Sequence, residues 1–238
     1  ILDLAMSANG ARVATSDGTL RVFDRRFQFG WERQLETSGS DFLLGPQEVA
    51  VRRGGQVVEL ARENGKLRKS QLVPPGAGWA YDKSGLRVNP HGPILPMPAE
   101  DGLLRGNGRQ VTKQSGQKSE AVTLTHPARA FVSLGNQPLA WTKAGLEWGN
   151  LRLAGAFDRV IPFLNRALVV EGDSLSLVGK VEASDRPDFL SKALQWKAGA
   201  RVGAIDAVGE KLLCGLQQGG CKLWVVSPYF LEADHPGE

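Results

Sequence analysis

An all-β fold built from repeated units is predicted by three observations on this sequence. In the stretch ATSDGTLRVFD (14–24), runs of alternating apolar and polar residues lie on both sides of Asp17-Gly18, a dipeptide typical of a tight hairpin turn. A similar hairpin, LQQGGCKLWVV (216–226), lies near the other end of the chain. Helical periodicity is nearly absent, since only residues 185–197 could form a helical turn or two. Short strands with glycine turns at a regular period predict a β-propeller.

Weaker copies of this hairpin fill the chain between its two ends. The turns of all the units lie at Gly18, Gly55, Gly85, Gly116, Gly145, Gly172-Asp173 and Gly219, at intervals of 28 to 46 residues. Apolar stretches that we expect to form first strands precede the hairpins, at residues 1–7, 40–46, 76–81, 101–107, 129–135, 159–165 and 202–208. Fourth strands are visible in some units, at residues 30–36, 66–73, 193–199 and 229–234.

The sequence thus predicts a single β-propeller domain over residues 1–238, with about seven short blades of three to four antiparallel strands and six blades as the alternative. A small sheet cannot bury both of its faces alone, whereas a ring of such sheets packs face to face. The approximate blades are residues 1–40, 41–74, 75–99, 100–126, 127–156, 157–200 and 201–238.

Residues 1–24 resemble a WD-repeat unit, with Phe23-Asp24 where that family prefers Trp-Asp. Residues 210–226 are similar, with Trp224 in the aromatic position but Val225 where Asp would stand, and the family's Gly-His pair is missing throughout. Residues 25–35 and 62–72 instead resemble the outer strand of pyrroloquinoline-quinone-type propeller repeats, which also occur in cofactor-free envelope scaffolds. The likeness is specific only in the first and last units. It implies a scaffold or interaction platform more often than an enzyme.

Charge indicates where a partner could bind. The chain has 29 basic and 25 acidic residues, a net charge of +4, and two stretches rich in cations. These stretches form a possible anion-binding or partner-contact patch made of Arg105, Arg109, Lys113, Lys118, Lys66, Arg68 and Lys69. The alternative is a set of solvated loops and edge strands guarded by Lys and Arg. No aromatic residue interleaves either stretch, so nucleic acid is not the expected partner.

Residue patterns for catalysis or cofactor binding do not stand out. His91, His126 and His235 lack partners at metal-ligand spacing, and no Gly-x-Ser-x-Gly elbow occurs. Glu171 and Asp173 flank a tight turn and most simply serve that turn. We therefore predict no catalytic residue, no cofactor and no metal ligand.

Cys214 and Cys221 occupy the places of Val13 and Leu20 in the matching hairpin, so we expect both to face one side. Two alternatives remain open, a pair of free buried thiols or a cross-strand disulfide. The disulfide would indicate an oxidising compartment.

These features predict a non-enzymatic scaffold or protein–protein interaction module that presents loops on a rigid propeller, within a larger protein or complex. Candidate contact segments are residues 74–76, 89–98 and 105–118. The rivals are a propeller hydrolase, lactonase or lyase with a central-channel site, and an anion- or nucleic-acid-binding protein. No run is long and apolar enough to span a bilayer. The first residue is Ile1, which indicates a processed or trimmed chain; the compartment, cytoplasm or cell envelope, is left open.

Overall fold

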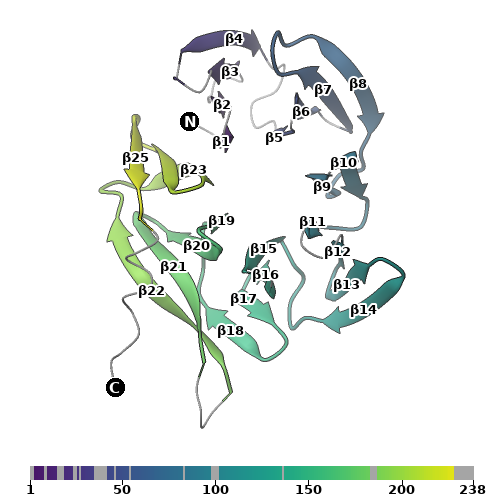
Figure 1. Ribbon diagram of the computed structural model, residues 1–238, viewed down its shortest axis with the longest axis vertical. Helices are drawn as coiled ribbons and strands as arrows, with labels where there is room; N and C mark the ends of the chain where they lie inside the picture. Colours follow the sequence, from purple (N-terminus) through teal and green to yellow (C-terminus); the bar gives the residue numbers. More distant parts are fainter. Residues whose placement is uncertain are drawn as a thin grey trace. The chain divides into compact units, whose positions relative to one another are not determined.

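The computed structural model describes residues 3–7, 10–14, 19–23, 26, 28–34, 42–45, 47–53, 55–82, 84–97, 102–135, 137–182 and 187–227. Their regular structure consists of the β-strands β1 to β25, most of which are labelled in Figure 1. Within each sheet, strands that follow one another in the chain pair with each other in antiparallel orientation. The fold is an all-β β-propeller, as the repeated hairpins predict. The described residues form two compact groups, which are described one after the other.

The first group contains three sheets and the turn Gly172–Ser174. Their strands, in hydrogen-bonded order, are β1 (Asp3–Ser7), β2 (Gly10–Ala14), β3 (Thr19–Phe23) and β4 (Phe29–Gln34); β5 (Phe42–Leu44), β6 (Glu48–Arg53), β7 (Gln56–Ala61) and β8 (Leu67–Leu72); and β23 (Val202–Val208), β24 (Lys211–Leu216) and β25 (Cys221–Val225). The first strands lie together, since β1 contacts both β5 and β23.

The second group contains four sheets. Their strands are β9 (Gly78–Asp82) and β10 (Gly85–Asn89); β11 (Ile94–Met97), β12 (Gly102–Asn107), β13 (Gln110–Ser115) and β14 (Lys118–Thr123); β15 (Ala130–Leu134), β16 (Gln137–Thr142), β17 (Gly145–Trp148) and β18 (Leu151–Ala154); and β19 (Arg159–Phe163), β20 (Arg166–Glu171), β21 (Ser174–Val181) and β22 (Phe189–Lys197). Again the first strands meet, because β11 contacts β9 and β15, and β15 contacts β19.

The predicted number of about seven blades of three to four strands is wrong. Five blades have four strands, whereas β23–β25 form a three-stranded sheet and β9–β10 only a hairpin. The hairpin is short because the proline-rich stretch after it, which includes β11, pairs with β12 in the next sheet. Consequently β12, within residues 101–107 that were expected as a first strand, is the second strand of its sheet.

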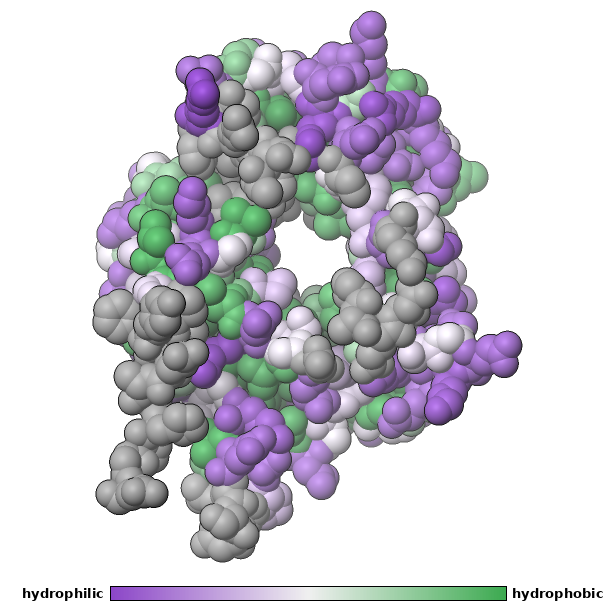
Figure 2. All heavy atoms as spheres, in the orientation of Figure 1, coloured by the Kyte–Doolittle hydropathy of each residue, from purple (hydrophilic) through white to green (hydrophobic). Residues whose placement is uncertain are grey.

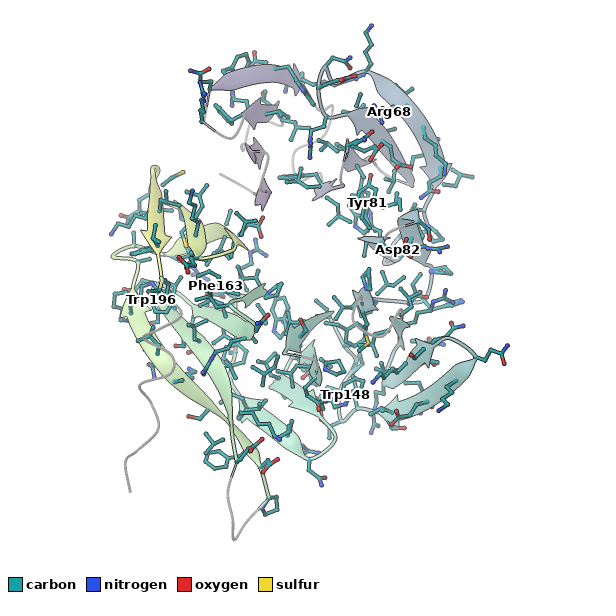
Figure 3. All side chains as sticks on the ribbon, viewed as in Figure 1. Arg68, Tyr81, Asp82, Trp148, Phe163 and Trp196 are labelled. Carbon is teal, nitrogen blue, oxygen red and sulfur yellow. The ribbon has the colours of Figure 1, made fainter. Side chains whose placement is uncertain are left out.

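The buried side chain of Asn89 fixes this change of sheet at the end of β10. Its Nδ2 donates to the carbonyl oxygen of Gly106 at 2.8 Å and to that of Pro93 at 3.2 Å. The Gly106 N–H donates in turn to the Pro93 carbonyl at 2.8 Å. The turn of the hairpin itself is closed by Asp82, whose carboxylate accepts hydrogen bonds from the Ser84 N–H and the Arg87 guanidinium, each at 2.7 Å (Figure 3).

Packing between neighbouring sheets forms the core in each group. In the first group a cluster joins β3 to β5–β7, made of Leu20, Val22, Phe42, Val49, Val51 and Leu60. In the second group one cluster joins the β11–β14 and β15–β18 sheets and another joins β15–β18 to β19–β22. The burial of apolar side chains on both faces of the small sheets removes them from water and supplies most of the stabilisation.

One further expectation is corrected by a strand assignment. Residues 189–197, within the stretch that could form a helical turn, are the long strand β22. The hairpin turn at Asp17-Gly18 and the fourth strand at residues 229–234 lie outside the described residues. Among the described residues, no helix is long and apolar enough to cross a membrane.

Candidate interaction surface

The outer strand β8 exposes both apolar and basic side chains. Leu67 at its start is 60% exposed and Leu72 at its end is 80% exposed. Between them lie Arg68 and Lys69, which are also exposed, and Lys66 immediately precedes the strand. We call residues 66–72 the β8 edge. Exposed apolar side chains that gather in one patch mark interaction sites, whereas scattered single ones are ordinary on a surface.

The turn before β8 is held by the outer strand of the neighbouring sheet. Trp31 of β4 donates its indole N–H to the Arg62 carbonyl oxygen at 2.8 Å, and Arg33 donates to the Gly65 carbonyl at 2.9 Å. Gly65 has a positive φ of 69° and lies against the Trp31 ring, which a Cβ at this position would approach to 3.1 Å. The start of the β8 edge is therefore anchored to β4.

The register of β7 and β8 sorts the edge into two faces. A bulge between Glu59 and Leu60 pairs Leu67 with Leu60, and Leu72 with Gln56. Because cross-strand partners share a face, Leu67 and Leu72 both extend the face of Leu60, which belongs to the buried cluster. This face of the β8 edge, called its apolar face, carries Leu67 and Leu72 with Ser70 between them.

The opposite face is basic. Lys69 pairs in register with Glu59, on the other side of the sheet from Leu60. Arg68 forms an ion pair with Glu48 of β6 at 2.7 Å, and Glu48 shares the face of Glu59 according to the β6–β7 register (Figure 3). Both carboxylates belong to inner strands, whereas the three cations belong to the outermost strand and the residue before it.

The other outer strands of the first group also carry exposed apolar side chains. Phe29 of β4 is 58% exposed, and Leu223 and Val225 of β25 are 48% and 66% exposed. In the second group, the described residues include only Val181 among such large exposed hydrophobics. In Figure 2, β8 shows hydrophilic and hydrophobic residues side by side, whereas β14 is mainly hydrophilic.

The second basic stretch, predicted as part of the same patch, is divided over its own sheet. Lys113 and Lys118 line one shallow groove with Ser115, Ser119 and Glu120, and Glu120 lies directly opposite Lys113. Arg105 pairs with Thr112, a neighbour of Lys113, and so lies on the other face. Arg109 donates through Nε to the Leu124 carbonyl oxygen at 2.9 Å at the β12–β13 turn.

The two basic stretches belong to different groups of residues. Lys66, Arg68 and Lys69 lie in the first, and the stretch from Arg105 to Lys118 lies in the second. The candidate patch is thus two separately built surfaces, of which the β8 edge combines charge with exposed apolar side chains.

Both cysteines are free, but only Cys214 is buried, whereas Cys221 is exposed, so the expected pair of buried thiols is half wrong. The two side chains point to opposite faces of their hairpin. Cys221 pairs with Gly215, whereas Cys214 pairs with Lys222, so the pairing is displaced by one residue from the expected same-face arrangement. Burial raises the pKa of Cys214 to about 12. Burial also raises the pKa of Cys221, so both are protonated at neutral pH and poorly nucleophilic.

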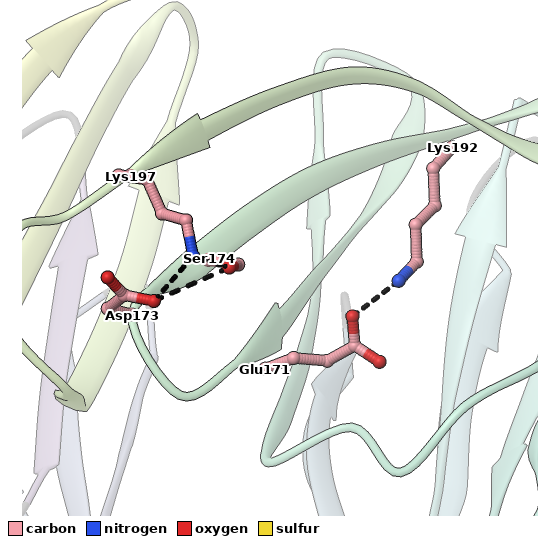
Figure 4. A network of polar contacts seen from close by, with 5 residues as sticks. All are labelled: Glu171, Asp173, Ser174, Lys192 and Lys197. Carbon is pink, nitrogen blue, oxygen red and sulfur yellow. Dashed lines mark hydrogen bonds and ion pairs between the residues drawn. The ribbon is translucent and has the colours of Figure 1, made fainter.

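The carboxylates at the β20–β21 turn are paired with lysines of β22 (Figure 4). Glu171 forms an ion pair with Lys192, and Asp173 accepts a hydrogen bond from Lys197 at 2.8 Å. The Lys197 ammonium lowers the pKa of Asp173 below its usual value. These contacts tie the turn to its outer strand, a stabilising role wider than the turn-only role expected from sequence.

Glu147 is a buried, hydrogen-bonded carboxylate that no sequence motif identifies. It is buried in β17 and accepts hydrogen bonds from the Thr125 hydroxyl, and from the backbone N–H groups of Thr125 and His126 at 3.2 Å each. Burial alone would raise the pKa of Glu147, but these hydrogen bonds outweigh it and hold the pKa below its usual value. The residue clamps the connection that follows β14.

The histidines stay apart in the described part of the chain. His91 follows β10 and His126 lies in the connection after β14, while His235 lies outside the described residues. No group of three metal-ligating side chains occurs among the described residues. Of the candidate contact segments, residues 74–76 form an exposed loop directly after β8, and residues 94–97 are strand β11.

Comparison with solved structures finds similar propellers. BamB from Moraxella catarrhalis matches with a TM-score of 0.61 and 12% identity, covering 100% of this chain and 84% of that one. The β-propeller domain of Myceliophteria thermophila Cps50 (Swd1) matches with a TM-score of 0.61 and 10% identity, covering 95% and 96%. BBS1N, solved in complex with ARL6DN, matches with a TM-score of 0.58 and 11% identity, covering 92% and 87%. At these identities the likeness shows the fold.

Neither a protein-family model nor a curated protein sequence matches the chain. The class that fold and comparisons define is a β-propeller. The repeat type suggested by the first and last units stays a prediction.

Proposed function

We propose that this chain is a non-enzymatic propeller module that binds a protein partner, within a larger protein or a complex. The observation that carries the proposal is the exposure of large apolar side chains along the outer strands of the first group, Phe29, Leu67, Leu72, Leu223 and Val225. Covering such side chains by a partner removes apolar surface from water, which drives most protein association.

The rigid framework supports the same proposal. Trp31 and Arg33 hydrogen-bond to the turn before β8, so the exposed strand is presented without an ordering cost at its start. Structural neighbours include BBS1N, which was solved in complex with ARL6DN, and this makes a protein partner a reasonable expectation for the present propeller.

The test is purification of the tagged chain from its source cells at physiological salt. We expect a partner that stays bound through size exclusion at a fixed stoichiometry. A chain that elutes without a bound partner would contradict the proposal, and turnover of a small substrate, in a screen with and without divalent metal ions, would indicate an enzyme instead.

A further inference from the structure

We propose that the β8 edge binds an extended segment of its partner, with alternating apolar and acidic side chains, as an additional strand of the β5–β8 sheet. This inference rests on the proposed function and names the chemistry of the partner. It is carried by the backbone edge, the apolar face and the basic face of β8 together.

The backbone of β8 offers an open edge. Among the described strands β8 pairs with β7 alone, and its six residues match the usual length of a strand in a globular protein. An unpaired edge presents N–H and C=O groups that an extended chain can complete by hydrogen bonding. A segment added there gains affinity from the ladder and specificity from its side chains.

The apolar face sets half of the specificity. Leu67 and Leu72 lie on the face that carries Leu60 and the buried cluster, so this face continues the core outward to the uncovered edge. Every second residue of an added strand would point to the same face. Apolar residues at those positions would cover the two leucines.

The basic face sets the other half. The β8 edge carries Lys66, Arg68 and Lys69, and no acidic residue lies between residues 66 and 72. Arg68 already pairs with Glu48, behind it in the sheet, while an added strand would lie on the outer side of β8. Acidic side chains on the second face of that strand would be close to the cations, and opposite charges across a ladder stabilise pairing.

Charge argues against a second copy of this chain as the occupant. Pairing β8 with β8 of another copy would bring two identical basic strands onto one ladder, which like-charge repulsion disfavours. The chemistry of the edge therefore favours an acidic partner strand.

The experiment uses the full chain and a fluorescein-labelled peptide of alternating glutamate and valine, about eight residues long to span β8. Binding is followed by fluorescence anisotropy at low and high salt. Two control peptides replace every glutamate by lysine, or alternate residues by proline, which removes the N–H donors of the ladder.

We expect saturable binding of the glutamate peptide, weakened several-fold by high salt, and no measurable binding of either control peptide. The double variant L67K/L72K should weaken binding about tenfold or more, because it removes the apolar face. The control variant T123K changes Thr123, which ends β14 as Leu72 ends β8, and it should change binding by less than about twofold. The charge reversal Lys69→Glu should favour the lysine peptide.

Since Leu67 and Leu72 are largely exposed, the variants should fold, which circular dichroism and the melting temperature verify. Equal binding of the glutamate and lysine peptides, unchanged binding by L67K/L72K, or equal weakening by T123K would overturn the inference. Self-association of the wild type that L67K/L72K abolishes would also overturn it, in favour of a second copy. Anionic vesicles that bind wild type while the peptide does not would overturn it in favour of a membrane surface.

The result is separable from the proposed function. If a native partner co-purifies and L67K/L72K retains it at wild-type levels, only the β8 inference fails. If no partner co-purifies with the wild type, the proposed function fails, whatever the peptide does.

Discussion

The outer strands β8 and β14 share a length of six residues and the same succession of exposed and half-buried positions, yet they present different chemistry. β8 begins and ends on exposed leucines, Leu67 and Leu72, whereas β14 has Lys118 and Thr123 at those places. The chain after β14 is clamped by Glu147, while the chain after β8 continues into the exposed residues 74–76. Outer strands with one exposure pattern can thus present an apolar surface or a polar one.

The largest effect should come from the cores beneath the two strands, which we expect to be equally tight. Leu60 and Leu104 are both almost fully buried, and Leu60→Ala or Leu104→Ala should each lower the free energy of unfolding by about 2–5 kcal/mol. Urea denaturation followed by circular dichroism measures both. A much smaller loss for L60A would show that the layer below β8 is loose, and the comparison would then no longer concern the surface alone.

A pH-dependent loss should distinguish the end of β14. Glu147→Gln should cost about 1–3 kcal/mol at neutral pH, because a buried carboxylate with three hydrogen bonds is lost. The pKa of Glu147 is lowered in the folded state, so its stabilisation is complete above the unfolded-state value of about 4.3 and is lost as pH falls through the folded value.

Melting curves of wild type and E147Q between neutral and acidic pH measure this dependence. The two curves should converge at low pH. A constant difference at every pH would mean that hydrogen-bond geometry, rather than the charge, determines the contribution of the clamp.

The turns before the two strands provide a matched pair of glycines. Gly65 and Gly116 both have positive φ, but a Cβ at Gly65 would press on the Trp31 ring, while none of the described atoms lies within 4 Å at Gly116. Gly65→Ala should cost about 2 kcal/mol and Gly116→Ala about 1 kcal/mol, the backbone strain alone. Thermal unfolding gives both values, and equal losses would show that Trp31 yields without cost.

The smallest effect on stability should come from variants that change the exposed apolar character of the two strand ends. Leu72→Thr and Thr123→Leu exchange the residues at the ends of β8 and β14, and each should change stability by less than about 0.5 kcal/mol. Retention on a hydrophobic-interaction column should fall for L72T and rise for T123L. No change in retention for either would mean that these ends do not determine the apolar character of the surface.

Much of the fold follows from local pattern. The alternation around Gly55, Gly145 and Gly219 identifies hairpins that the structure contains, because a tight turn between apolar strands is encoded by adjacent residues. The blade count does not follow, because the pairing of β11 with β12 depends on Asn89 and Gly106, which are far apart in the sequence. The sequence pattern assigns residues 94–97 to the unit of residues 75–99 because they are adjacent in the chain, whereas in the structure they pair with β12 of the next sheet.

The candidate surface is predictable only in part. The cations of residues 66–69 are visible as a run, but Leu67 and Leu72 look like core residues of an ordinary strand until their exposure is known. A bulge places both leucines on one face, and the residue spacing alone would assign them to opposite faces. The Glu147 clamp likewise joins strand β17 to Thr125 and His126 in the connection after β14, which are distant from it in the sequence, so no short pattern marks it.

The amide bridge of Asn89 has a practical consequence for anyone who would shorten or rearrange this chain. A cut at residues 99–100, where the repeat ends by sequence, would leave β11 on one fragment and its partner β12 on the other. Excising the β9–β10 hairpin would take away the donor that holds Pro93 and Gly106. Gene fusions and circular permutations should therefore keep residues 78–123, which span β9 to β14, as one uninterrupted segment.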